Sequence, residues 1–175
     1  MRLVAVQDQD FNPGALLAML GQAGTGGIAS FIGIVRQTAD GSLAALRLEH
    51  YPGMTEKALE RLADEAQARW ALTGCILIHR VGRLEPGQNI VFVATASAHR
   101  AQALSATAYL IDQLKTRAPF WKAEESTAGE TRWVEAKGAD DEAAAAWQDP
   151  RETGNAPARE TTPDNKNLPH GAGRL

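Results

Sequence analysis

The amino-acid sequence predicts a single α+β domain that combines about three helices with mixed or antiparallel strands. The chain has 175 residues, which is enough for one ordinary domain with a hydrophobic core and not comfortably enough for two. Apolar residues make up 44% of the chain, a share typical of globular proteins. Strand-like and helix-like segments follow the order βαββαββαββ, which contains too few βαβ units for a doubly wound sheet.

The first fifty residues predict a strand, a short helix and two further strands. Residues 2–7 show the alternation of a short strand. A helix is expected over 13–20, because a proline stands in its first turn and a glycine follows its last residue. The stretch 26–36 is β-type and contains glycines, which indicate a bulge or a close backbone approach. The turn signal Asp40-Gly41 then leads into a returning strand over 43–51.

The segment 55–71 carries the clearest helical pattern of the chain. Thr55 is a residue type that can cap the first turn, so we expect the helix to begin there. The side chains that we expect to face the core recur at helical spacing. They are Leu59, Leu62, Ala63, Ala66 and Trp70.

Two buried-type strands and a second long helix are expected next. The strands cover 75–81 and 90–96. The helix starts after Ser97, its expected cap, and runs to about Arg117, because Pro119 prevents its continuation. The stripe expected to face the core consists of Ala101, Leu104, Ala108, Ile111 and Leu114.

Two short strands, over 120–124 and 132–136, complete a predicted domain that covers residues 1–137. The net charge of the chain is −3, and residues 138–175 carry all of it, with seven acidic and four basic side chains. This segment has few side chains that could form a core, so we expect a flexible acidic tail. A short helical piece is expected within it at 141–147.

Composition excludes several classes of protein. No apolar run approaches the ~20 residues that cross a bilayer, and the N-terminus does not read as a signal peptide. Cys75 is the only cysteine, which excludes an internal disulfide and an all-cysteine metal site. The charge balance gives no global basic field to attract nucleic acid. We therefore expect a cytoplasmic protein that binds neither membranes nor nucleic acid.

His99 and Arg100 are the first candidates for a binding site. They fall in the first turn of the predicted second long helix, where the helix dipole favours anions over cations. Two basic residues at that position could hold a phosphate together with the free backbone N–H groups. A solvated helix start explains them equally well, so the residues alone leave both interpretations open.

The second group of candidates surrounds the proline break after that helix. Lys115 and Lys122 flank Pro119, and a lysine beside other cations or apolar walls can act as a base or a nucleophile. Basic residues also complement the dipole at a helix C-terminus, and from the residues alone this structural interpretation is the stronger one. Arg36 ends a predicted strand, where an arginine is usually only solvated. Cys75 fits a buried, unreactive thiol.

Six short segments in the first 137 residues decide between these interpretations. They are GIASFIGIVR at 27–36, LEHYPGM at 48–54, IHRVG at 78–82, SAHR at 97–100, LKTRAPFWK at 114–122 and RWVE at 132–135. In this order they resemble the successive signature segments of the molybdopterin synthase large-subunit family. The segment that ends in FWK is highly specific, whereas IHRVG alone would be weak. Residues after 137 do not take part in the resemblance.

The resemblance implies a hammerhead-type α+β fold and a sulfurtransferase. The large subunit of this family forms a homodimer, and one small ubiquitin-like sulfur-carrier subunit docks at each end to give a heterotetramer. The carrier's C-terminal Gly-Gly tail ends in a thiocarboxylate and enters a cavity of the large subunit. Two sulfurs convert cyclic pyranopterin monophosphate, a phosphorylated pterin, into the dithiolene of molybdopterin. No metal or other cofactor is implied.

The resemblance also assigns roles to individual residues. It implies that Lys115 and Lys122 are catalytic, and that Arg36, His99 and Arg100 bind the substrate, with Arg36 supplied across the dimer. Preorganised cations would stabilise the thiocarboxylate, the substrate phosphate and an oxyanion formed during acyl hydrolysis. A non-catalytic module that binds a phosphorylated ligand through the same basic residues is the alternative. The presence of both lysines speaks against it.

Overall fold

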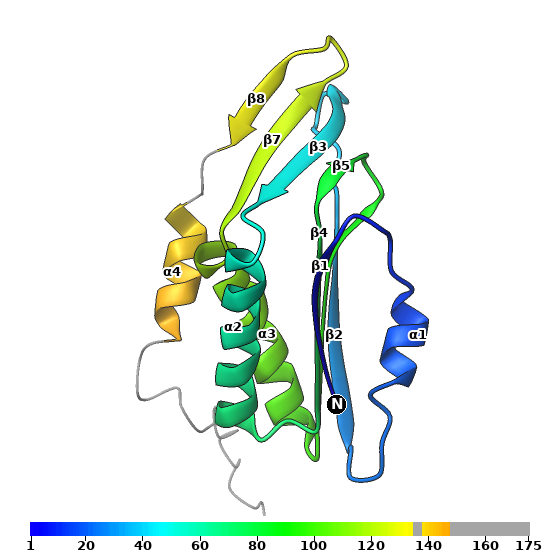
Figure 1. Ribbon diagram of the computed structural model, residues 1–175, viewed down its shortest axis with the longest axis vertical. Helices are drawn as coiled ribbons and strands as arrows, with labels where there is room; N and C mark the ends of the chain where they lie inside the picture. The colour runs from blue at the N-terminus through cyan, green and yellow to red at the C-terminus, as the bar shows by residue number, and fades with distance from the viewer. Residues whose placement is uncertain (135–137, 148–175) are drawn as a thin grey trace, which may run out of the picture.

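The computed structural model describes residues 1–134 and 138–147, which form two four-stranded sheets and four helices (Figure 1). The expected order of elements is confirmed, with one short strand added after β4, and the helical piece expected at 141–147 is found as part of α4. The elements are β1 (Arg2–Gln7), α1 (Pro13–Ala18), β2 (Gly27–Ile34), β3 (Leu43–His50), α2 (Met54–Trp70), β4 (Gly74–Arg80), β5 (Gly82–Leu84), β6 (Asn89–Ser97), α3 (Arg100–Arg117), β7 (Phe120–Ser126), β8 (Thr131–Val134) and α4 (Gly138–Ala146).

The first sheet carries the main core and has the strand order β1-β4-β6-β2. β1 runs parallel to β4, whereas β6 is antiparallel to both of its neighbours. α2 and α3 lie on one face of this sheet and α1 lies on the other (Figure 1). Leu77, Val93 and Leu110 are fully buried between the sheet and the two long helices. β2 is an edge strand, so one side of its backbone pairs with no strand of the described chain.

The second sheet has the order β5-β3-β7-β8 and is antiparallel throughout. It projects beyond the end of the first sheet (Figure 1). Only Val81 separates β4 from β5, so the chain passes directly from one sheet into the other. Gly82 makes this possible with a φ of 86°, a conformation that side chains with a Cβ rarely adopt. The sequence analysis did not predict β5, because three residues are too few to show a period.

α2 follows the expected apolar stripe, but its start differs from the prediction. Leu59 and Leu62 are fully buried, as expected. The N-cap is Gly53, whose backbone N–H donates to the carboxylate of Glu56 over 2.6 Å. Thr55 lies one residue inside the helix, where its hydroxyl donates to the backbone carbonyl of Pro119 over 3.1 Å. Thr55 therefore fastens α2 to the segment before β7.

The predicted core stripe of α3 is largely wrong. Leu104 is 61% exposed, and Ala101 and Ala108 are exposed as well. Polar Thr107 faces the core instead, because its hydroxyl bonds to the hydroxyl of Thr95 at 2.8 Å and donates to a backbone carbonyl of β2. Partners far away in the sequence thus satisfy a polar group that the pattern places on the surface, and the apolar stripe stays outside. The helix also begins at Arg100, with His99 rather than Ser97 at the cap position.

α4 begins where the flexible tail was expected to begin, and it packs on the domain. Ala144 is buried, and its carbonyl accepts a hydrogen bond of 3.0 Å from the side chain of Gln113 on α3. Trp147 joins the main core through its ring, and its indole N–H donates to Asp112 over 2.8 Å. Through these contacts Ala144 and Trp147 hold the end of α4 on the domain, within the segment expected to be a tail. The rest of the expected tail, 148–175, lies outside the described residues.

Candidate functional site

A cavity of about 410 Å³ lies where the two sheets meet the last turns of α3. Its walls come from both sheets and from α3, and ten of its thirteen lining residues are apolar. The three exceptions are Lys115, Lys122 and His79. Carboxylates are absent from the lining, so the described part of the chain presents an apolar cavity with positive charge.

Lys115 and Lys122 reach this cavity from two different elements. Lys115 lies in the last turn of α3, and Lys122 lies in β7, paired with Leu48 and Val134 on its two sides. α3 ends because Ala118 adopts an extended backbone before Pro119. This turn sends the chain back into the second sheet, so two lysines seven positions apart line one cavity.

His79 is a residue of this cavity that the sequence analysis did not single out as functional. Its ring stacks on Phe120, with centroids 3.9 Å apart and planes 21° apart. Its Nδ1 lies 2.8 Å from the backbone carbonyl of Arg80. Burial, together with the positive charges of Lys122 and His50, lowers the pKa of His79 to about 4, although the hydrogen bond to the Arg80 carbonyl opposes part of this shift. His79 is therefore neutral at physiological pH.

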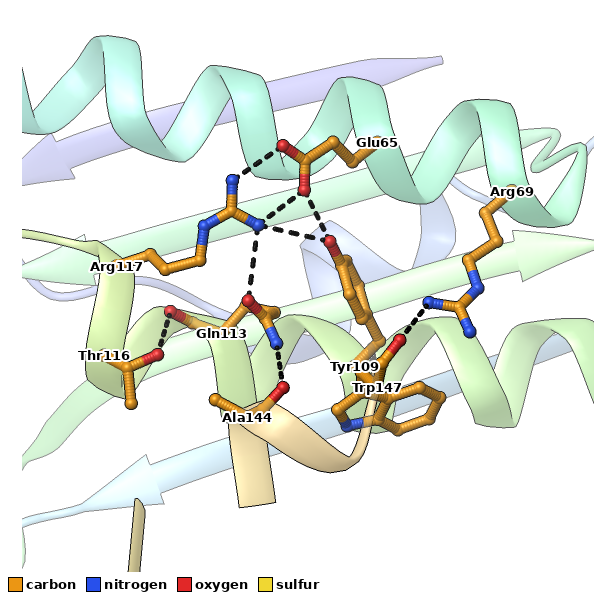
Figure 2. Close-up of polar contacts among 8 residues, drawn as sticks. All are labelled: Glu65, Arg69, Tyr109, Gln113, Thr116, Arg117, Ala144 and Trp147. Atoms are coloured by element: carbon orange, nitrogen blue, oxygen red, sulfur yellow. Dashed lines mark hydrogen bonds and ion pairs between the residues drawn. The ribbon is translucent and has the colours of Figure 1, made fainter. Parts of the chain in front are cut away.

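Arg117 stands between the two lysines in sequence but does not line this cavity. Figure 2 shows that it points toward Glu65 on α2 instead. Its guanidinium bonds to both carboxylate oxygens of Glu65, at 2.6 and 2.7 Å. Tyr109 donates its hydroxyl to the same carboxylate over 2.5 Å, and burial together with this bond raises the pKa of Tyr109 to about 12. This cluster fixes the last turn of α3 against α2, and with it the position of Lys115.

The residues expected to bind the substrate phosphate lie outside the cavity of the same chain. His99 and Arg100 are exposed at the start of α3, and the helix places Arg100 roughly 22 Å along its axis from Lys115. Arg36 is exposed just beyond the end of β2 that lies near the cavity. One chain therefore brings the two lysines together but does not bring His99 or Arg100 to them.

The described residues offer little for metal or thiol chemistry. They contain no group of three or more His, Cys, Asp or Glu side chains that could hold a metal ion. Cys75 is buried in the core of the first sheet, and burial raises the pKa of its thiol to about 11. This confirms the expected unreactive thiol. No helix among the described residues is long and apolar enough to span a membrane.

Comparison with known sequences identifies the family. The model of the MoaE protein family matches residues 6–117. A "Molybdopterin synthase catalytic subunit" from Mesorhizobium japonicum is 51% identical over 148 residues, which cover 83% of this chain and 92% of that protein. The protein of the same name from Escherichia coli K12 is 53% identical over 123 residues, covering 70% and 81%.

Solved structures agree with this result. The MoaE protein from Burkholderia ambifaria superimposes with a TM-score of 0.72 at 46% identity and covers 85% of this chain and 99% of its own. A molybdopterin synthase structure from Staphylococcus aureus gives a TM-score of 0.71 at 27% identity, covering 77% and 98%. A complex of subunits 1 and 2 of molybdopterin-converting factor from Helicobacter pylori shares the fold, with a TM-score of 0.62 at 20% identity, covering 78% and 90%. The chain therefore belongs to the MoaE protein family, that of the molybdopterin synthase catalytic subunits.

Proposed function

We propose that this chain catalyses sulfur transfer to a phosphorylated pterin in the cytoplasm. The sulfur donor is the thiocarboxylated C-terminus of a small ubiquitin-like subunit, and the acceptor is cyclic pyranopterin monophosphate, which becomes the dithiolene of molybdopterin. The named relatives support the reaction, and the Helicobacter pylori complex supports a small-subunit partner. The observation that carries the proposal is one apolar cavity with both Lys115 and Lys122 in its wall.

The cavity suits the chemistry of a thiocarboxylate. The thiocarboxylate sulfur forms a bond to an oxygen-bearing carbon of the pterin precursor, and a C–O bond of that carbon breaks, so that its oxygen leaves as water or stays on the phosphate. Water then adds to the acyl carbon, and the acyl–sulfur bond breaks. The sulfur stays on the pterin and the carrier leaves as a carboxylate. The thiocarboxylate and the oxyanion of the hydrolysis step are both negative, and the ammonium groups of Lys115 and Lys122 stabilise both in a largely apolar surrounding.

A homodimer would complete the site with residues that one chain keeps apart. β2 is an edge strand with exposed Ile28, Ile32 and Ile34, and an exposed apolar edge of this kind favours pairing with another strand. The exposed stripe of α3 around Leu104 lies on the helix that packs beside β2. Both features support an interface between two copies of this chain.

The direction of β2 explains why such a dimer would assemble the substrate site. β2 starts beside Arg100, because a Cβ on Gly27 would lie 3.2 Å from the Arg100 Cα, and it ends near the cavity and Arg36. A two-fold axis pairs two β2 strands antiparallel. The start of β2 in one copy then lies beside the end of β2 in the other. His99 and Arg100 of one copy would thereby meet Arg36 and the lysines of the second.

The substrate phosphate would bind at this junction. Arg36 supplies one guanidinium, and the second copy supplies Arg100, His99 and the free backbone N–H groups at the start of its α3. The resemblance implied that Arg36 is supplied across the dimer. In the proposed assembly Arg36 and the two lysines come from one copy, and His99 and Arg100 come from the other. The proposed assembly has two such sites and takes one small subunit at each.

Reconstitution tests this function directly. The purified chain is mixed with its thiocarboxylated small subunit and the cyclic pterin precursor, and molybdopterin is measured as its oxidised fluorescent derivative. We expect product in proportion to the thiocarboxylate supplied, and none from the carboxylate form of the small subunit. Tight binding of the precursor without any product would contradict catalysis and would support the alternative of a non-catalytic phosphate-binding module.

A further inference from the structure

His79 is held in one orientation from two sides. Its Nδ1 faces the carbonyl of Arg80, which can only accept a hydrogen bond, so Nδ1 must carry the hydrogen. Arg80 is itself fixed, because its guanidinium donates to the carbonyls of Asp8 and Asn89 over 3.0–3.2 Å. The stack on Phe120 sets the plane of the ring. In the neutral ring Nε2 therefore carries a lone pair, in a fixed direction.

The surroundings keep the ring neutral. His79 shares its cavity with Lys115 and Lys122, and a third positive charge there would be repelled by both and poorly solvated by the apolar walls. The pKa of about 4 agrees with this geometry. Within the described residues no group donates a hydrogen bond to Nε2 of His79.

Among the described residues that line the cavity, Nε2 of His79 is also the one side-chain acceptor. The other lining side chains are apolar or carry an ammonium group, which only donates. A ligand that combines an anion with an N–H group would pair its anion with the lysines. Within the described lining, its N–H group would find a side-chain acceptor at His79, and a buried N–H without a partner weakens binding.

We propose that Nε2 of His79 accepts a hydrogen bond from the backbone N–H of the last residue of the carrier tail, and so aligns the thiocarboxylate with Lys115 and Lys122. This assignment rests on the proposed function. A peptide C-terminus has its anion and its last N–H within one residue of each other, which suits three groups that line one small cavity. The pterin also has N–H groups, but the residues proposed for its phosphate lie outside this cavity.

Two substitutions of His79 separate its two nitrogens. His79→Asn keeps an N–H near the Nδ1 position, for the Arg80 carbonyl, and removes the acceptor at Nε2. His79→Gln is longer and can place its carbonyl oxygen near the Nε2 position. In the reconstituted reaction we expect His79→Asn to raise the KM for the thiocarboxylated small subunit about tenfold. The KM for the precursor should stay unchanged, and His79→Gln should recover most of the loss in carrier KM. Both variants lose the stack on Phe120, so any fall in melting temperature should be common to the two.

A carrier whose last amide is replaced by an ester tests the same bond from the other side. The ester has no N–H, so it should bind wild-type chain about tenfold more weakly and should lose nothing further with His79→Asn. Isothermal calorimetry with the carboxylate form of the small subunit gives these affinities without turnover. Failure of sulfur transfer would therefore not be mistaken for failure of the His79 assignment.

Nitrogen NMR of the imidazole provides a measurement on unaltered protein. We expect the signal of an unprotonated Nε2 at pH 7 in the free chain, and a shift of that signal when the carboxylate form of the small subunit binds. A protonated Nε2 would overturn the proposal. So would an unchanged carrier KM and affinity in His79→Asn, or a rise confined to the precursor KM, which would assign the contact to the pterin.

Discussion

The guanidinium of Arg117 bonds to both oxygens of the Glu65 carboxylate and ties the last turn of α3 to the middle of α2 (Figure 2). The same guanidinium lies 3.3 Å from the side-chain oxygen of Gln113, whose amide holds α4. The basic residues around Pro119 thus have different roles. Arg117 holds the last turn of α3 against α2, and Lys115, two positions earlier, lines the cavity.

We expect Glu65→Gln to lower stability at neutral pH by about 1 kcal/mol, because the ion pair is partly exposed and screened by water. The hydrogen bond from Arg117 lowers the pKa of Glu65, although burial opposes part of this effect. A carboxyl with a lowered folded-state pKa stabilises fully above the unfolded value of about 4.3, and this contribution is lost as the pH falls through the folded value. Unfolding by urea at pH 7 and at pH 3 should show the gap between wild type and variant closing in acid. Glu130→Gln, an exposed carboxylate with no resolved ion pair, should show no gap at either pH.

Trp147→Ala should lower the stability of the domain by about 2 kcal/mol. The Trp147 ring packs edge-on against Trp70 and Tyr109, with centroids 5.9 and 5.6 Å apart, and its N–H bonds to Asp112. A shift in melting temperature of several degrees measures the loss. Trp133, at 56% exposed, is the matched control, and Trp133→Ala should leave the melting temperature nearly unchanged.

The end of the folded unit can be located by truncation. A chain that ends at Trp147 should keep the melting temperature of the full chain, whereas one that ends at residue 137 should melt lower, because it lacks the contacts of α4 with α3. Equal melting temperatures for all three chains would show that α4 contributes nothing to the domain.

Arg100→Ala should weaken precursor binding about tenfold or more, because a charge-assisted hydrogen bond to phosphate contributes roughly 1.5–3 kcal/mol. Calorimetry with the cyclic precursor measures this, and His99→Ala should act in the same direction. Melting temperatures should change little, since both side chains are exposed at the helix start. Unchanged binding in both variants would mean that His99 and Arg100 are only solvent-exposed residues at the start of α3 and do not bind the phosphate.

The proposed dimer makes a sharper prediction with the same variant. At a precursor concentration well below the wild-type Kd, Lys115→Ala should be nearly inactive and Arg100→Ala should lose about nine-tenths of its turnover or more. Exchange of subunits between them should restore about a quarter of wild-type turnover. In a mixed dimer one site combines both altered residues, and the other combines both intact ones. No recovery after subunit exchange, confirmed by mass spectrometry, would mean that each site draws its residues from one chain.

Sequence periodicity predicted the core-facing side of a helix where that side is set by the apolar spacing within the helix itself. The stripe of α2 around Leu59 and Leu62 was predictable because each of its positions that faces the core is apolar or small. The stripe of α3 was not, because Thr107 and Gln113 face inward and bond to groups of β2 and α4 that lie far away in the sequence. A polar residue with a distant partner looks the same in sequence as one that faces water.

The residues of the candidate site also fall into those that local sequence predicts and those that depend on distant parts of the chain. Lys115 and Lys122 are close in sequence around a proline, so a shared cavity was within reach of a local argument. His79 could not be found from its neighbours in the chain. Its significance comes from Phe120, forty-one positions later, and from the lack of another side-chain acceptor among the described residues of the lining. The placement of His99 and Arg100 at a site depends on a second copy, which a single chain does not reveal.

A single-turnover measurement with Lys115→Ala tests the central claim most directly. The variant is preassembled with thiocarboxylated small subunit, mixed with the cyclic precursor, and assayed for molybdopterin, with Lys57→Ala, an exposed lysine outside the cavity, as its control. We expect Lys115→Ala to lose more than about 99% of the sulfur-transfer rate while it keeps its fold and its affinity for the small subunit, as removal of a group that stabilises charge in the transition state predicts. Lys122→Ala should be impaired as well, and Lys57→Ala should match wild type. Near-normal turnover by Lys115→Ala would contradict the account.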